Sequence, residues 1–387
     1  MPTNSTQPPR AAWLVVMAVV CLLLAPATTS AQKIKPPPPP PPPPAGAILF
    51  DASTWPSAQW GMNVDGSEKR VAFLHQFMTK PVPSARVYGT DPVRHRWWLA
   101  LGEVQVVGAP RTVYEVFACR PDQDGNLQQV QLTALYPFVD FHHTSGAHSY
   151  LGWSNNGTDS FVSFRGKTYG AEDAQTPANL NDPSDDLIHI FRLNFSASQI
   201  EAALTLGVDP KFGINEFSTG TLESVLEAGG DLTEWVLAYH DWSPSGKHIA
   251  YSTPWGLWVA DCTVGTATHG DAKTRQIWTE CRFPRWSPNG LRIAMSHDGN
   301  VWTISPDGSG AAKVLGKTRS DSYSVPVWSP DNSQLAVSHR RAKGVDSEYF
   351  LSRVPAAGGT ITILTKELDP TVERRPTGWS ANVVAGP

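Results

Sequence analysis

The sequence is poor in cysteine, has no concentrated basic stretch, and contains a single notable apolar run, near its N-terminus. Of its four cysteines, Cys21 lies in that run. The three that remain are an odd number, which excludes a framework of paired disulfides. The net charge is −4 with no basic stripe, so nothing in the composition points to nucleic acid as a partner.

The sequence also lacks the short motifs that mark common catalytic sites. It has no Gly-x-Ser-x-Gly nucleophile elbow. It has no His-Glu-x-x-His motif, no P-loop and no Gly-x-Gly-x-x-Gly fingerprint. A partial calcium loop at Asp122 lacks its third acidic ligand and the distal glutamate, so a hairpin turn explains it better. These absences favour a protein that binds over one that catalyses.

The first 45 residues differ in composition from the rest of the chain. An apolar run from Ala11 to Ala25 is followed by small residues, an order that predicts a secretory signal peptide over residues 1–31. An uncleaved membrane anchor is the alternative, although a spanning helix needs ~20 apolar residues. Residues 32–45 contain nine consecutive prolines. They predict a stiff spacer of about 28 Å, with a disordered leader as the alternative.

A phrase built on Trp-Ser recurs along the sequence. Each copy is followed by a turn such as Pro-Asn-Gly, in which proline presets φ and Gly or Asn accepts a left-handed conformation. Apolar runs follow, for example HIAYS, RIAMS and QLAVS, and further turns separate two more short strands. The pattern predicts four short antiparallel strands in about every 43 residues, which is the period of a propeller blade.

The sequence therefore predicts an all-β fold, a six-bladed propeller of four-stranded antiparallel blades over residues 46–387. The C-terminal phrase TGWS is expected to join the N-terminal strands in AGAILFDAS, QWGMNVDGS and KRVAFLH, which would close the ring. The register disfavours a disulfide between Cys262 and Cys281, which lie at opposite ends of their strands. The innermost-strand positions are then Thr90, Trp153, Trp242, Trp286, Trp328 and Trp379.

Residues 196–232 depart from this pattern. ASQIEAALTLG and TLESVLEAGG are expected to be short helices of an insertion that follows the third blade. A hidden seventh blade is the alternative interpretation.

The phrases WSPSGKHIAYS, WSPNGLRIAMS, WSPDNSQLAVS, MNVDGSEKRVAFL and SPDGSGAAKVL resemble the TolB-type propeller repeat. The resemblance spans roughly residues 46–380 and is strongest from His240 onward. It implies the fold and leaves the function open, because such repeats occur in periplasmic TolB, which binds envelope partners, in propellers ahead of serine peptidase domains, and in sugar-acid lyases. The α/β domain expected before the TolB propeller has no counterpart in the pattern here.

Connections that enter the innermost strands are expected to gather at the mouth of a central funnel. Their mixed charges and aromatic rings suit the binding of a peptide, a sugar or a partner's loop. An ordinary solvated loop position is the alternative for each of them. The predicted binding residues are His148, Glu234, His240, Glu280, Arg282, Tyr323, Glu373, Arg374 and Arg375.

A histidine cluster lies in one of these connections and is formed by His142, His143 and His148. Imidazole binds transition metals, and a divalent metal with a bound water would act there as a Lewis acid. Polar loop histidines are the alternative, and no cofactor is the main expectation for the chain.

The sequence thus predicts an exported, periplasmic or secreted protein that binds an envelope protein or peptide without catalysis. Membrane contact is expected only through an uncleaved N-terminal anchor. The alternative is an enzyme with its site at the funnel, a lyase or hydrolase acting on a sugar-acid or other polysaccharide, suggested by the histidine cluster together with Arg374 and Arg375. A propeller that docks a separate peptidase subunit is a third reading.

Overall fold

The computed structural model describes residues 47–52, 58–67, 69–74, 88–90, 98–106, 113–121, 127–135, 139–140, 151–155, 160–168, 187–194, 197–213, 216, 220–229, 237 and 239–380. The segments expected as signal peptide, 1–31, and as spacer, 32–45, lie outside the described residues. Regular structure in the described part is almost all antiparallel β-strand, in agreement with the predicted all-β class.

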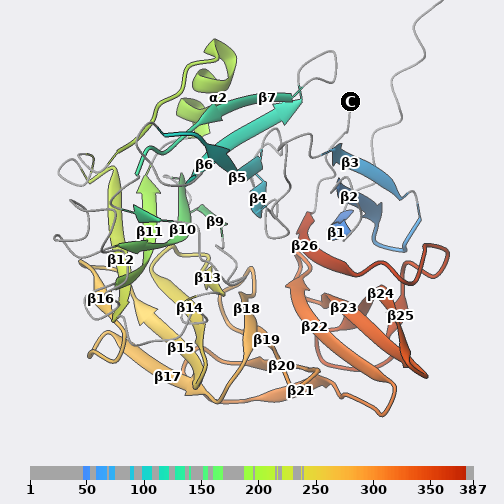
Figure 1. The fold of residues 1–387 in the computed structure, drawn as a ribbon. Helices are drawn as coiled ribbons and strands as arrows, with labels where there is room; N and C mark the ends of the chain where they lie inside the picture. Colours follow the sequence, from blue (N-terminus) through green and yellow to red (C-terminus); the bar gives the residue numbers. More distant parts are fainter. Residues whose placement is uncertain are drawn as a thin grey trace, which may run out of the picture. The chain divides into compact units, whose positions relative to one another are not determined.

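Three sheets between residues 240 and 363 follow the Trp-Ser repeat strand by strand (Figure 1). Sheet 4 contains β13 (His240–Trp242), β14 (His248–Thr253), β15 (Gly256–Asp261) and β17 (Thr274–Trp278). Sheet 5 contains β18 (Arg282–Trp286), β19 (Ile293–His297), β20 (Asn300–Ile304) and β21 (Ala312–Leu315). Sheet 6 contains β22 (Asp321–Trp328), β23 (Gln334–Lys343), β24 (Asp346–Pro355) and β25 (Thr362–Ile363). As predicted, the repeat tryptophan ends the first strand of each sheet.

The serine of each Trp-Ser-Pro phrase closes the turn that follows it. The hydroxyl oxygens of Ser243, Ser287 and Ser329 accept hydrogen bonds from the backbone N–H five residues later, at 3.1, 2.9 and 2.9 Å. Three residues after each serine stands a residue of positive φ, a glycine in two copies and Asn332 in the third. Glycine and asparagine tolerate this conformation best, so the phrase fixes both the turn and the register of the hairpin.

Sheets 1 and 2 are formed by the N-terminal strands, with one strand from the C-terminus. Sheet 2 contains β4 (Tyr88–Thr90), β5 (Trp98–Val104), β6 (Val113–Pro121) and β7 (Leu127–Gln131). Sheet 1 has the order β26 (Arg374–Ser380), β1 (Ala47–Ala52), β2 (Ala58–Asn63) and β3 (Arg70–Leu74). In sheet 1, Trp379 of β26 lies opposite Ile48 of β1, so the pairing of chain ends predicted from TGWS is present.

Sheet 3 is assembled from strands that are less regular in the sequence. In it β10 (Ser160–Thr168) pairs with β9 (Leu151–Asn155), with the short β8 (Val139–Asp140) and with β11 (Leu187–Asn194). Then follow β12 (Leu222–Gly229) and β16 (Ala267–Thr268), which pair in parallel. Because β16 belongs to the connection between β15 and β17, sheet 3 borrows a strand from the chain of sheet 4.

The expectation for residues 196–232 was correct at one of its two segments. The first segment is the helix α2 (Ala197–Leu206). Among the described residues, no helix has both the length and the apolarity that crossing a membrane requires. The expectation of a helix in TLESVLEAGG was wrong, because Leu222–Gly229 is the strand β12. Leu, Glu and Ala favour helix intrinsically, but pairing with β11 and burial of Leu222 and Leu226 outweigh that preference. The insertion therefore lies inside the third repeat, between β11 and β12.

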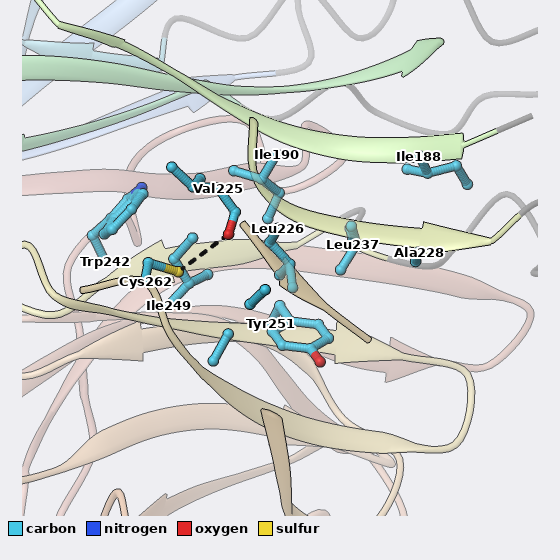
Figure 2. Close-up of a cluster of buried hydrophobic side chains, with 12 residues drawn as sticks. Ile188, Ile190, Val225, Leu226, Ala228, Leu237, Trp242, Ile249, Tyr251 and Cys262 are labelled. Carbon is cyan, nitrogen blue, oxygen red and sulfur yellow. Dashed lines mark hydrogen bonds between the residues drawn. The ribbon is translucent and has the colours of Figure 1, made fainter. Parts of the chain in front are cut away.

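Apolar side chains fill the space between sheets 3 and 4, 4 and 5, 5 and 6, and 6 and 1. Figure 2 shows the cluster between sheets 3 and 4, in which Ile190 and Leu226 face Ile249 and Tyr251, all fully buried. Each such aliphatic side chain contributes about 1.5–3 kcal/mol by leaving water. Similar clusters join sheet 4 to sheet 5, sheet 5 to sheet 6, and sheet 6 to sheet 1.

Hydrogen bonds also link neighbouring sheets. The backbone N–H of Trp286 donates to Asp241 Oδ2 at 2.7 Å, and Trp328 Nε1 donates to the carbonyl of Arg285 at 3.0 Å. The thiol of Cys262 donates to the carbonyl of Val225, 3.6 Å away (Figure 2). Cys119, Cys262 and Cys281 are all buried and free, so the absence of a bridge between the last two is confirmed.

Candidate functional site

A cavity of about 740 Å³ is lined by residues of sheets 5 and 6, with contributions from sheets 4 and 1. Its walls include the connections that enter β18 and β26, the strand β22, and the β19–β20 turn. Five of the nine predicted binding residues line it. These five are Glu280, Arg282, Tyr323, Glu373 and Arg375.

Of the other four predicted residues, two lie outside the described residues and two are described but do not line the cavity. His148 and Glu234 belong to the first group. His240 is completely buried, in β13. Arg374 is only 4% exposed, and its guanidinium donates to the carbonyls of Asp369, Val372 and Tyr349 at 2.7, 3.0 and 3.2 Å.

Alternation along β26 explains why Arg374 and Arg375 differ. Successive residues of a strand point to opposite faces, so Arg375 reaches the cavity and Arg374 turns inward to hold the connection before β26. Burial lowers the pKa of Arg374 from its ordinary value. The assignment of Arg374 as a ligand-binding residue is therefore corrected to a structural one.

Acidic side chains at the cavity are largely neutralised by neighbouring cations. Glu373 accepts two hydrogen bonds from Arg375, at 2.7 and 2.8 Å, in a bidentate pair. Asp298 accepts from Lys317 at 3.0 Å, and this hydrogen bond lowers the pKa of the carboxyl. Because such exposed pairs contribute little stability, their main effect is on the charge that a ligand would meet.

A buried polar network stands behind Tyr323 on sheet 6. The ring of Tyr323 lies 4.8 Å from that of His339, which is fully buried. His339 Nε2 is 2.7 Å from Asp321 Oδ1, and its Nδ1 is 3.1 Å from Ser352 Oγ. Arg341 Nε donates to the same Asp321 oxygen at 2.8 Å.

This network supports the cavity wall and does not form a nucleophilic site. Ser352 is fully buried, so its hydroxyl cannot reach a substrate. Burial raises the pKa of Asp321, but hydrogen bonds from Arg341, His339 and Ser320 outweigh burial and hold the pKa well below its usual range. Burial also lowers the pKa of His339, against the attraction of Asp321. Asp321 is thus ionised at neutral pH and fixes the start of β22.

Two strained residues occupy equivalent places in the cavity wall. Phe283 and Val325 have φ of 55° and 50°, and each stands before a proline, three residues before a repeat tryptophan. At both places two residues of the first strand oppose one residue of the second, which is a β-bulge. Positive φ at a bulky or β-branched residue costs on the order of 1–3 kcal/mol and is concentrated at functional sites.

Thirteen of the lining residues were not predicted from the sequence, and five of these form one group on sheet 6. The predicted residues were chosen in connections between strands, whereas these five lie on β22, β23 and β24. The available signal was alternation, because every second residue of adjacent strands shares one face. The five residues of this group are Ser322, Ser324, Ser338, Arg340 and Tyr349.

The predicted metal site is not among the described residues. His142, His143 and His148 all lie outside them, so a divalent metal at this cluster stays a prediction. Within the described ranges, no group of three or more His, Cys, Asp or Glu side chains is arranged to hold a metal ion.

Comparison with protein-family models and with curated proteins found no match. Among solved structures, a TolB of Agrobacterium tumefaciens is similar over 83% of this chain and 88% of its own, at 13% identity and a TM-score of 0.48. TolB of Acinetobacter baumannii is similar over 87% of this chain and 66% of its own, at 14% identity and a TM-score of 0.48. Oligogalacturonate lyase of Vibrio parahaemolyticus is similar over 82% of this chain and 85% of its own, at 10% identity and a TM-score of 0.40. Such values assign no function, and the fold assignment rests on the strand pairing.

Proposed function

We propose that this chain is an exported, six-bladed β-propeller that binds a protein or peptide of the cell envelope and catalyses no reaction. Export is inferred from the signal-like pattern of residues 1–31. The proline tract then supplies distance between a held N-terminus and the blades.

Contacts between the innermost strands support a closed ring. Strand β4 contacts β9, β9 contacts β13, β13 contacts β18, and β18 contacts β22. Strand β22 contacts β26, which in turn contacts β4. This order returns to its start after six sheets, and the pairing of β26 with β1 leaves neither chain end as an open edge.

The observation that carries the binding proposal is the cavity at the innermost strands. It brings together charged side chains of both signs, the rings of Tyr239, Phe283, Tyr323 and Tyr349, and serine hydroxyls. Mixed polarity with aromatic anchors is typical of surfaces that hold peptides and protein loops. Among the described residues that line the cavity, no serine or cysteine side chain is hydrogen-bonded to a histidine, which favours binding over chemistry at this site.

Chemical crosslinking of the full chain in its native envelope tests this proposal. We expect a small set of proteins to be captured, and purified protein to leave polysaccharides intact. Cleavage of a sugar-acid polymer, with stoichiometric metal that is lost on His142→Ala and His143→Ala substitution, would replace the proposal with the enzymatic alternative. Failure to capture any protein would contradict the proposal as well.

A further inference from the structure

We propose that Arg340 anchors a carboxylate of the bound peptide, so that the cavity selects a segment with an acidic side chain. This inference rests on the proposed function and names the chemistry of its ligand. It begins from the register of sheet 6. Ser322 lies opposite Arg340, which lies opposite Tyr349 on the next strand, and Ser324 lies opposite Ser338.

Register places these five side chains on one face of the sheet. Residues directly opposite each other in adjacent strands project to the same side, as do residues two apart in one strand. All five also line the cavity. The result is a patch of three serine hydroxyls, one phenol and one guanidinium, here called the donor face.

The polar side chains of the donor face do not bond to other groups in the described part of the chain. In the described part of the chain, the hydroxyls of Ser322, Ser324, Ser338 and Tyr349 make no hydrogen bond, and Arg340 has no ion pair. Ser338 is only 4% exposed as a residue. Arg340 is exposed to solvent. A ligand that accepts hydrogen bonds would satisfy these groups together.

Charge determines which acceptor fits the donor face. No acidic side chain is part of that face, so Arg340 there is an uncompensated positive charge. Guanidinium groups match carboxylates in a planar, two-bond geometry, and hydroxyls from serine or tyrosine can bind the remaining oxygen lone pairs. A carboxylate is therefore the group we assign to this position.

The rest of the cavity argues against a polyanion as ligand. Glu280, Asp298 and Glu373 also line it, and Glu280 has no cationic partner among the described residues. A chain of uronic acids would bring a further carboxylate against the unpaired Glu280, and like charges brought together repel, whereas Glu373 and Asp298 are already paired with Arg375 and Lys317. A peptide can present one acidic side chain to Arg340 and place neutral or basic residues elsewhere.

Peptide arrays probed with the purified full chain test the assignment. The array holds unstructured peptides that each contain one glutamate, their glutamine counterparts, and immobilised oligogalacturonate. We expect glutamate peptides to bind, and the glutamate-over-glutamine preference to fall about 10- to 100-fold in Arg340→Gln, the loss expected for a charge-assisted hydrogen bond. Arg340→Lys should retain part of the preference, because lysine keeps the charge without the fork.

Arg319→Gln is the matched control, because Arg319 is exposed and lines no part of the cavity. It should bind as the unchanged protein does, and both variants should show an unchanged melting temperature. Peptides that bind without any preference for glutamate, or a preference that survives Arg340→Gln, would overturn the inference while leaving the proposed function intact. Binding of oligogalacturonate through Arg340 in place of peptides would also overturn it.

Discussion

Sheets 4, 5 and 6 each use four strands in chain order, whereas sheet 3 takes its strands from residues 139–229 and from β16 at Ala267–Thr268. In the C-terminal sheets, the serine of each Trp-Ser-Pro phrase stabilises the first hairpin through a hydrogen bond to a backbone N–H of the same hairpin. In sheet 3 the edge is covered by distant chain, since Thr266 Oγ1 donates to the carbonyl of Ser224 at 2.7 Å. Repeats that specify their own turns are regular, and a repeat that lacks them depends on its neighbour.

Sheet 1 is the extreme case of dependence on distant chain, and deleting residues 374–387 should have the largest effect. Without β26, strand β1 becomes an open edge, and the apolar cluster of Ile48, Phe50 and Leu351 loses the cover of Trp379. We expect loss of a single cooperative thermal transition, measured by circular dichroism, together with aggregation. Deleting only residues 381–387 is the control and should leave the transition in place.

Core substitutions compare the two kinds of sheet directly. Ile190 in sheet 3 and Ile293 in sheet 5 are both fully buried, so replacing either with alanine should lower the free energy of unfolding by about 2–5 kcal/mol. Urea denaturation measures this. Leu291→Ala, at a side chain 66% exposed, should change it by less than about 0.5 kcal/mol. A silent Ile190→Ala would mean that sheet 3 does not pack as sheet 5 does.

A pH effect is expected at the contact between sheets 4 and 5. Burial raises the pKa of Asp241 to about 7, against hydrogen bonds from the backbone of Trp286 and Trp242. Between pH of about 4 and 7 the folded protein holds a proton that the unfolded chain has released. The contribution of Asp241 to stability should therefore decline by about 1–3 kcal/mol as pH rises through this window.

Asp241→Asn isolates that contribution in urea denaturation at pH 5 and pH 8. The comparison with the unchanged protein is needed because burial lowers the pKa of His189 to about 4, which makes stability rise with pH over part of the same window. We expect the free energy of unfolding of the variant, minus that of the unchanged protein, to be larger at pH 8 than at pH 5. Equal pH profiles for the two proteins would refute the prediction.

The smallest expected difference in stability is between removing a hydrogen bond within one turn and removing one that joins two sheets. Ser287→Ala removes the hydroxyl that accepts from Arg292 N, 2.9 Å away, in a buried turn, and should cost about 1–2 kcal/mol. Thr266→Val removes a bond at a half-buried position between sheets 3 and 4 and should cost less, about 0.5 kcal/mol. Thermal melts of both variants measure the order. A larger loss in Thr266→Val would reverse the comparison.

Local sequence was sufficient where turn chemistry and apolar alternation agree. The strand ends at Trp242, Trp286 and Trp328, and the pairing of Trp379 with Ile48, followed from the repeat alone. Strand β12 did not, because its helix-forming residues are held in a strand by β11 and β16. That information lies in tertiary pairing and not in the segment itself.

The candidate site was predictable to the extent that it lies in connections. Glu280, Arg282 and Arg375 line the cavity because the chain enters innermost strands there. Arg340 and Tyr349 lie on paired strands, and their meeting depends on the register of β23 with β24. Arg374 was misassigned because one step along β26 reverses the side chain's direction. Register between strands thus decides what composition alone leaves open.

Site-specific photocrosslinking in the native envelope tests most directly whether the cavity of a closed propeller holds a protein partner. A photoreactive phenylalanine derivative in place of Tyr349, inside the cavity, should give one discrete adduct with another protein. The same residue in place of Trp255, 56% exposed and outside the cavity lining, should give none. Adducts from both positions alike, or from Trp255 alone, would contradict the account.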